Sequence, residues 1–142
     1  MGSILAIDYG LKRIGIAVSD PSRIFAFPHS VIENKSLEYV LVNLKKIVSE
    51  KEIDLIIVGT PFFKNPDIRI KDDNEMQKII NDFVTKLKTK LNVQIEIVDE
   101  SLSSFSANEN LKAMGISAKK SKDFIDKEAA RIMLEEFIKE LK

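Results

Sequence analysis

The chain of 142 residues contains no cysteine and only one histidine. Without cysteine it can form no disulfide, no thiolate metal site and no cysteine nucleophile. The formal net charge is +0, from 22 basic and 22 acidic residues, so any binding of nucleic acid must come from local basic clusters. No apolar run approaches the roughly 18 residues of a membrane span, and the first one is too short for a signal peptide. These absences predict a cytoplasmic protein with no membrane partner.

The residues that are present predict one domain over residues 1–142, because 44% of them are hydrophobic and can form a normal core. Strands are predicted over 3–9, 13–20, 25–33, 54–59 and 93–98, and helices over 36–51, 73–91, 105–114 and 122–141. The early strands have short connections and form an antiparallel meander, whereas the later strands follow helices and lie parallel to the first. We therefore expect an α/β fold, a five-stranded mixed sheet with helices on both faces.

The most informative stretch is Asp8-Tyr9-Gly10, where a carboxylate ends a predicted buried strand. A buried carboxylate is costly unless a cation, backbone N–H groups or a metal ion offsets its charge. Taken alone, an aspartate two residues before a glycine is more often a turn device than a catalytic residue. The rest of the chain has to decide between these interpretations.

Further acids are expected to meet Asp8 at one edge of the sheet. The carboxyl ends of parallel strands share an edge, and ligands bind beyond it. Asp99 and Glu100 follow the last predicted strand and arrive there. Of the two we favour Glu100, with Asp99 as the alternative. By themselves they could be a solvated strand end, or the start of a cap before Ser103 and Ser104.

The last predicted helix supplies a third acid, Asp126. It precedes Ala129 by three residues and Ala130 by four, so it shares a face with the apolar stripe of that helix. Because both alanines are small, the helix can approach the sheet closely. An isolated Asp126 could instead be a first-turn acid favoured by the helix dipole.

Asp8, Glu100 and Asp126 together predict a catalytic metal centre. Like charges in one place disfavour full ionisation unless a cation is present. With no histidine or cysteine nearby, clustered carboxylates suit Mg²⁺ or Mn²⁺. A pair of such ions is the usual machinery for hydrolysing a phosphodiester.

Basic residues stand near two of these acids. Lys12 and Arg13 follow the first, and Lys119, Lys120 and Lys122 lie in the predicted connection before the helix of the third. A polyanion over an acidic site needs flanking cations, so these five residues are the predicted nucleic-acid contacts. Alone, the second group is typical of a solvated loop.

Several aromatic or titratable residues receive other assignments. His29 stands beside Pro28 in a predicted edge strand and is interpreted as structural or surface-exposed. Phe62-Phe63 could belong to the core or stack on a base, and the core is favoured. Strand alternation directs Tyr9 to the face opposite Asp8.

At these motifs the chain resembles the YqgF/RuvX family. The resemblance spans nearly the whole chain and rests on the following segments: Asp8-Tyr-Gly10-Leu-Lys-Arg13-Ile-Gly15, Ile57-Val-Gly59-Thr60-Pro61, Asp99-Glu100-Ser101-Leu102-Ser103-Ser104, Lys119-Lys120-Ser121-Lys122 and Ile125-Asp126-Lys-Glu-Ala129-Ala130. The chain departs from the family pattern at Ser101, where the family has arginine. It has serines for two threonines, and Ile68 follows Asp67 where the family has glycine.

The resemblance implies an RNase H-like fold and a metal-dependent nuclease that acts on structured RNA, such as the 5′ end of pre-16S rRNA, or on branched DNA such as a Holliday junction. The sequence does not choose between these substrates, nor between a monomer and a homodimer. Two other functions stay open. A non-catalytic nucleic-acid-binding protein is favoured slightly by the arginine missing at Ser101. An actin-like phosphotransferase or ATPase also begins with Asp-x-Gly, but it needs a second, duplicated domain.

Overall fold

The computed structural model describes residues 2–59, 69–98 and 118–141, and of these it describes the side chains outside 69–77 and 118–127. The elements run in the order β1 (Ser3–Asp8), β2 (Arg13–Ser19), β3 (Ala26–Glu33), α1 (Leu37–Glu50), β4 (Ile53–Gly59), α2 (Arg69–Lys90), β5 (Gln94–Val98) and α4 (Ala118–Glu140). No helix among them is both long and apolar enough to cross a membrane.

The strands form one five-stranded sheet in the order β3-β2-β1-β4-β5. The β1–β2 and β2–β3 pairs are antiparallel, and the β1–β4 and β4–β5 pairs are parallel. The predicted meander with two added parallel strands is therefore confirmed. The parallel arrangement brings the carboxyl ends of β1, β4 and β5 to the same edge.

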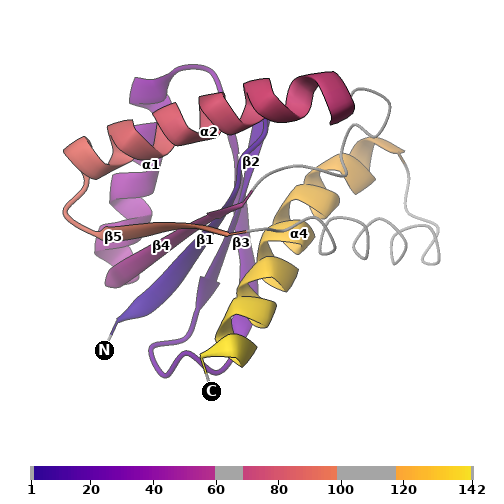
Figure 1. The fold of residues 1–142 in the computed structure, drawn as a ribbon. Coiled ribbons are helices and arrows are strands. Elements are labelled where there is room, and N and C mark those ends of the chain that lie inside the picture. Colours follow the sequence, from indigo (N-terminus) through magenta and orange to yellow (C-terminus); the bar gives the residue numbers. More distant parts are fainter. Residues whose placement is uncertain (1, 60–68, 99–117, 142) are drawn as a thin grey trace.

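Helices cover both faces of the sheet, with α1 and α2 on one side and α4 on the other (Figure 1). Alternation along β1 divides its side chains between two cores. Leu5 and Ile7 pack in the core beneath α1 and α2, whereas Ile4 and Ala6 pack in the core beneath α4. Every residue of β1 is buried, which is why this strand reads as a continuous apolar run.

The core beneath α4 depends on small side chains. Ala129 and Ala130 are fully buried, and Met133, Leu134 and Ile138 continue the buried stripe. Alanine lets a helix backbone approach a sheet closely, as the sequence predicts. The opposite side of α4 carries Arg131, which pairs with Glu128 and Glu135.

Helix α1 follows the sequence prediction closely, and two other helices begin earlier than predicted. The Ser36 hydroxyl caps α1 by accepting a hydrogen bond from the backbone N–H of Tyr39 at 3.1 Å. Helix α2 begins at Arg69 instead of the predicted Asp73, and α4 begins at Ala118 instead of Lys122. Alanine and lysine favour helix, so residues 118–122 extend α4 in place of a solvated connection.

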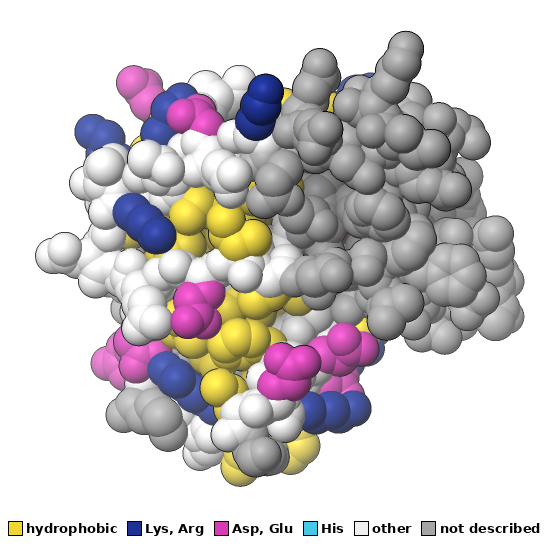
Figure 2. Space-filling model, viewed as in Figure 1, with side chains coloured by type: hydrophobic (Ala, Val, Ile, Leu, Met, Phe, Trp, Pro, Cys, Tyr) yellow, Lys and Arg dark blue, Asp and Glu magenta, His cyan; other side chains and the backbone are white. Residues whose placement is uncertain are grey.

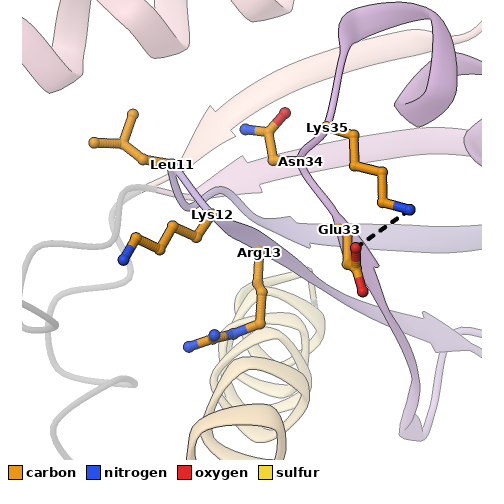
Figure 3. A pocket seen from close by; sticks show the side chains of 6 residues that line it. All are labelled: Leu11, Lys12, Arg13, Glu33, Asn34 and Lys35. Carbon is orange, nitrogen blue, oxygen red and sulfur yellow. Dashed lines mark ion pairs between the residues drawn. The ribbon is translucent and has the colours of Figure 1, made fainter.

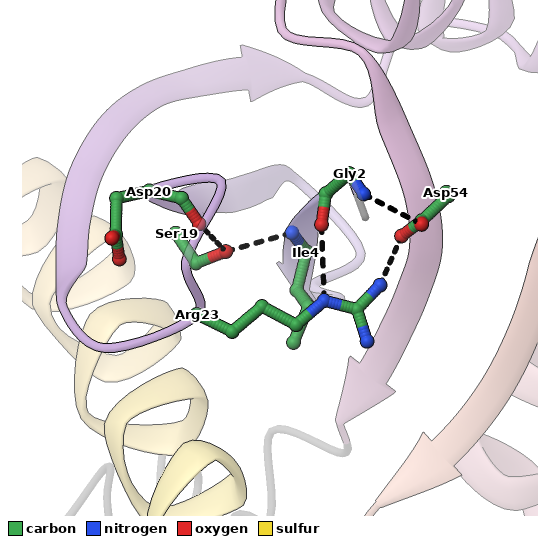
Figure 4. A network of polar contacts seen from close by, with 6 residues as sticks. All are labelled: Gly2, Ile4, Ser19, Asp20, Arg23 and Asp54. Carbon is green, nitrogen blue, oxygen red and sulfur yellow. Dashed lines mark hydrogen bonds and ion pairs between the residues drawn. The ribbon is translucent and has the colours of Figure 1, made fainter.

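Polar contacts close the end of the sheet opposite Asp8 (Figure 4). Arg23, at a positive φ of 56°, donates to the carbonyl of Gly2 at 3.0 Å and forms an ion pair with Asp54. The Gly2 N–H in turn donates to Asp54 at 2.8 Å. That hydrogen bond and the Arg23 guanidinium hold the pKa of the Asp54 carboxyl below its usual range. The network ties together the chain start, the β2–β3 turn and β4.

Candidate active site

Asp8 is the last residue of β1 and is fully buried. It alternates with Ile4 and Ala6, so it lies on the face that α4 covers. Tyr9 belongs to the opposite core, where its ring lies 4.6 Å from that of Phe83 in α2. The sequence prediction that Asp8 and Tyr9 serve opposite faces is therefore confirmed.

Glycines flank Asp8 on both neighbouring strands. In the sheet register Asp8 lies opposite Gly15 of β2 and beside Gly59 of β4. Register partners present their side chains to the same face, so neither neighbouring strand places a side chain beside the carboxylate at this level. The sheet itself therefore does not crowd the Asp8 carboxylate with a neighbouring side chain.

The turn after Asp8 is fixed by a glycine and an asparagine. A Cβ at Gly10 would lie 2.4 Å from the carbonyl oxygen of Arg13, so only glycine fits this turn. The Asn34 side-chain amide donates to the Gly10 carbonyl at 3.0 Å and to the Tyr9 hydroxyl at 3.2 Å. Its backbone N–H donates to the carbonyl of Lys12 at 2.9 Å.

Sequence reasoning missed Asn34. The only signal was an asparagine between a strand and a helix N-cap, a place where side-chain amides often bond to the backbone. Its partners lie 24 and 25 positions away in the chain, so the pattern alone could not identify them.

Arg13 shares the α4 face with Asp8. Ile14 and Ile16 belong to the core beneath α1 and α2, whereas Ala17 belongs to the core beneath α4, and alternation puts Arg13 with Ala17. Gly15 is the register partner of Asp8, and Arg13 stands two residues before Gly15. The backbone positions of Arg13 and Asp8 are therefore diagonal neighbours, about 7–8 Å apart. Arg13 therefore adds a positive charge on the same face of the sheet as Asp8.

Lys12 and Arg13 border a shallow groove of about 370 Å³, which is also lined by Leu11, Glu33, Asn34 and Lys35. Figure 3 shows the Lys12 and Arg13 side chains pointing to one side of this groove, with the Lys35–Glu33 ion pair on the other. The predicted basic residues beside Asp8 thus line a surface depression.

Asp126 lies within α4, four residues before Ala130 and seven before Met133. The start of β1 and the end of α4 lie at the same end of the sheet, so α4 runs antiparallel to β1 and its lower-numbered residues approach the edge where β1 ends (Figure 1). Glu100 and its alternative Asp99 lie outside the described residues. Within the part of the chain that the structure describes, no group of acids and histidines large enough to hold a metal is found.

The prediction that Lys119, Lys120 and Lys122 lie in a connection is wrong, since all three fall in the first turns of α4. That first turn contains no acidic residue. Cations at a helix N-terminus oppose the helix dipole, which favours anions there. The start of α4 therefore combines three lysines of the sequence with the positive end of the helix dipole.

Charge elsewhere is mixed. On the face in Figure 2, acidic and basic side chains of the described residues alternate around a central hydrophobic area, in keeping with the net charge of +0. Any attraction for a polyanion must therefore be local.

His29 is half-buried, and its Nδ1 atom lies 2.8 Å from the Ser30 hydroxyl oxygen. Burial lowers the pKa of His29.

The family model described as "RuvX: Holliday junction resolvase" matches residues 2–140. Among similar proteins, one from Maridesulfovibrio salexigens is 33% identical over 95% of this chain and 96% of its own length, and one from Chlorobium luteolum is 36% identical over 98% and 95%. Both are named "Putative pre-16S rRNA nuclease".

Solved structures with the same fold include Thermus thermophilus RuvC in complex with a Holliday junction substrate. Its TM-score is 0.57 at 11% identity, covering 99% of this chain and 96% of that one. The yeast mitochondrial Holliday junction resolvase gives a TM-score of 0.52 at 9% identity, covering 98% and 84%. At such identities the likeness shows the fold alone, which is RNase H-like as the sequence predicts.

Proposed function

This chain belongs to the RuvX family of Holliday junction resolvases, and from that membership we propose a metal-dependent nuclease built as one domain over residues 1–142. The observation that carries the proposal is the position of Asp8. This residue is a fully buried carboxylate at the carboxyl end of a central strand, with glycines as its register partners and with α4 covering its face of the sheet. In open sheets ligands bind beyond the carboxyl ends of the parallel strands, so the position of this carboxylate favours a functional role.

The donor chemistry at this edge fits a divalent cation with oxygen ligands. Asp8 offers carboxylate oxygens, and we assign Glu100 and Asp126 as the other ligands of Mg²⁺ or Mn²⁺. When bound, such ions act as Lewis acids that activate water and stabilise charge on a phosphoryl oxygen. The course of α4 supports the assignment of Asp126 as a ligand, because the N-terminal half of this helix lies toward the edge where β1 ends.

The basic residues hold the substrate backbone in this proposal. Arg13 lies on the Asp8 face and positions the phosphate next to the carboxylate, and Lys12 adds charge at the same turn. Lys119, Lys120 and Lys122 bind flanking phosphates together with the N-terminal N–H groups of α4. These cations offset the repulsion between clustered acids and a polyanion.

The substrate we favour is the 5′ end of pre-16S rRNA in the cytoplasm, because relatives that match nearly the whole chain bear that name. The description of the family model favours branched DNA as the second candidate. A non-catalytic binding protein is the third, since Ser101 stands where the family has arginine and a bidentate phosphate ligand is lost.

A cleavage screen separates these candidates. Pre-16S rRNA with its 5′ extension, a four-way DNA junction and an unstructured single strand are each incubated with the full chain in Mg²⁺, Mn²⁺ or a chelator. The proposal expects metal-dependent cleavage of the rRNA precursor at a defined position. Cleavage of the junction alone would select the resolvase function. Tight binding without cleavage of any substrate would select the non-catalytic function.

A further inference from the structure

The groove beside the β1–β2 turn carries an excess of positive charge. Its lining includes Lys12, Arg13 and Lys35 against one acid, Glu33, in a chain whose net charge is +0. The Lys35 Nζ atom lies 3.5 Å from the Glu33 Oε2 atom. The Glu33 side chain is 66% exposed and that of Lys35 is 62% exposed. An ion pair this exposed contributes little to stability, so Lys35 can exchange Glu33 for a phosphate at low cost.

An exposed aromatic ring on α1 lies next to one of the residues that line the groove, Lys35. The ammonium of Lys35 lies 5.1 Å from the centre of the Tyr39 ring, and Tyr39 is 41% exposed in the first turn of the helix. The backbone of that turn is fixed by the Ser36 cap. A cation next to an exposed ring on a rigid element is the combination with which proteins bind single-stranded nucleic acid, because every base offers a face for stacking.

The groove lies at the same edge of the sheet as Asp8. Arg13 begins β2 and pairs with Glu33 at the end of β3, while Asp8 ends β1. Two strand spacings separate β1 from β3, or about 10 Å. At about 3.4 Å per stacked nucleotide, a strand that leaves Asp8 reaches the far side of the groove after roughly three nucleotides.

We propose that this groove binds a single-stranded flank of the nucleic-acid substrate, with Lys12 and Lys35 on its phosphates and a base stacked on Tyr39. The inference deepens the proposed function, on which it rests, by making an unpaired flank of about three nucleotides or more a part of substrate recognition. It places the flank on the β3 side of Asp8, away from the start of α4.

Equilibrium binding tests the groove separately from cleavage. Fluorescein-labelled RNA and DNA hairpins with unpaired tails of 0, 2, 4 or 6 nucleotides on either side are titrated with the Asp8→Asn protein in a metal-free buffer. We expect affinity to rise between tails of 2 and 4 nucleotides. Tyr39→Ala and Lys35→Glu should each remove that gain, lowering the affinity for long tails by about 5- to 50-fold and leaving the tail-less hairpin unchanged.

Matched variants identify the cause. Tyr39→Phe keeps the ring and should restore binding, because stacking does not need the hydroxyl. Lys45→Glu changes an exposed lysine of the same helix outside the groove, and Phe25→Ala removes an exposed ring at the opposite end of the sheet. Neither control should alter the dependence on tail length.

The proposal is overturned if the tail-length gain persists in Tyr39→Ala and Lys35→Glu, if the controls lose it equally, or if a fully paired extension binds as well as an unpaired tail. The absence of any gain in the Asp8→Asn protein itself would overturn it too. A failed cleavage screen with tail-dependent binding intact would refute the nuclease function alone.

Discussion

At the scale of single residues, the account depends on a buried carboxylate and on the side chain that holds its turn. Asp8 lies between two glycine positions on the face of α4, and Asn34 fixes the turn that follows it. These residues serve different purposes. Asp8 is placed to bind a ligand, whereas the contacts of Asn34 are internal to the protein.

Replacing Asp8 by asparagine tests that difference through stability. Without metal we expect the variant to be as stable as the wild type or more stable, because removing one of several crowded like charges relieves repulsion. Adding Mn²⁺ at about 100 times its dissociation constant should stabilise the wild type by about 2.7 kcal/mol and the variant by much less. Thermal unfolding with and without Mn²⁺ measures both effects. A loss of several kcal/mol without metal would make Asp8 a structural residue.

Replacing Asn34 by alanine should destabilise the protein by about 1–2 kcal/mol, since two partly buried acceptors, the Gly10 carbonyl and the Tyr9 hydroxyl, lose their donor. Urea unfolding measures the change. The control is Asn43→Ala, because Asn43 makes a comparable 2.8 Å bond to the Tyr39 carbonyl on the exposed surface of α1. Equal losses in the two variants would show that Asn34 has no special role at the turn.

At the scale of elements, α4 has two distinct parts: a buried stripe that packs on the sheet and a first segment rich in lysine. Its buried alanine stripe holds it on the sheet, and its first turns carry Lys119, Lys120 and Lys122. At the opposite end of the sheet, the Asp54 carboxylate accepts a hydrogen bond from the Gly2 N–H and forms an ion pair with Arg23 of the β2–β3 turn.

Changing Lys120 and Lys122 to alanine should weaken binding to all nucleic-acid sequences alike. The slope of log affinity against log salt should shrink by about one to two units, because fewer counterions are released. Cleavage at saturating substrate should fall much less. Lys139→Ala, in the last turn of the same helix, is the control. An unchanged slope in the double variant would show that these lysines are ordinary solvated residues.

The Asp54 network predicts a dependence of stability on pH. The pKa of the Asp54 carboxyl is lower in the folded protein than its value of about 3.8 in the unfolded chain. The carboxylate therefore stabilises the fold fully above pH 3.8, and this stabilisation is lost as the pH falls through the lower folded-state pKa. Asp54 is largely exposed, so Asp54→Asn should cost at most about 1 kcal/mol at pH 7. Unfolding between pH 2 and 7 should show a shallower acid-induced loss in the variant. Parallel curves for the two proteins would contradict this.

The sequence predicted the elements better than the points where they begin. The apolar runs of β1 and β4 and the stripe of α1 identified strands and a helix, and short connections determined the meander. The sequence does not indicate where α4 begins, because a run of lysines such as Lys119, Lys120 and Lys122 is typical of a charged loop, although lysine is also a good helix former.

At the scale of the whole molecule, one mixed sheet brings distant residues to a common edge. Asp8, Arg13 and Asn34 meet there because β1, β2 and β3 all begin or end at that edge. The sequence places Arg13 near Asp8 because only a short turn separates the two residues in the chain. It could not predict Asn34 or the groove, since these depend on the exact register of β2 with β3 and on the turn geometry.

The central claim is that carboxylates at this edge bind the metal that cleavage requires. The most direct measurement is the rate of cleavage of the preferred substrate, at saturating concentration, as Mn²⁺ is titrated into the wild type and into Asp8→Asn, Glu100→Gln and Asp126→Asn. We predict no cleavage without metal, saturation with rising Mn²⁺ in the wild type, and a loss of more than about 100-fold in each variant, beyond the usual cost of changes in the outer shell of a metal site. Metal-independent cleavage, or full activity in Asp8→Asn, would contradict the account.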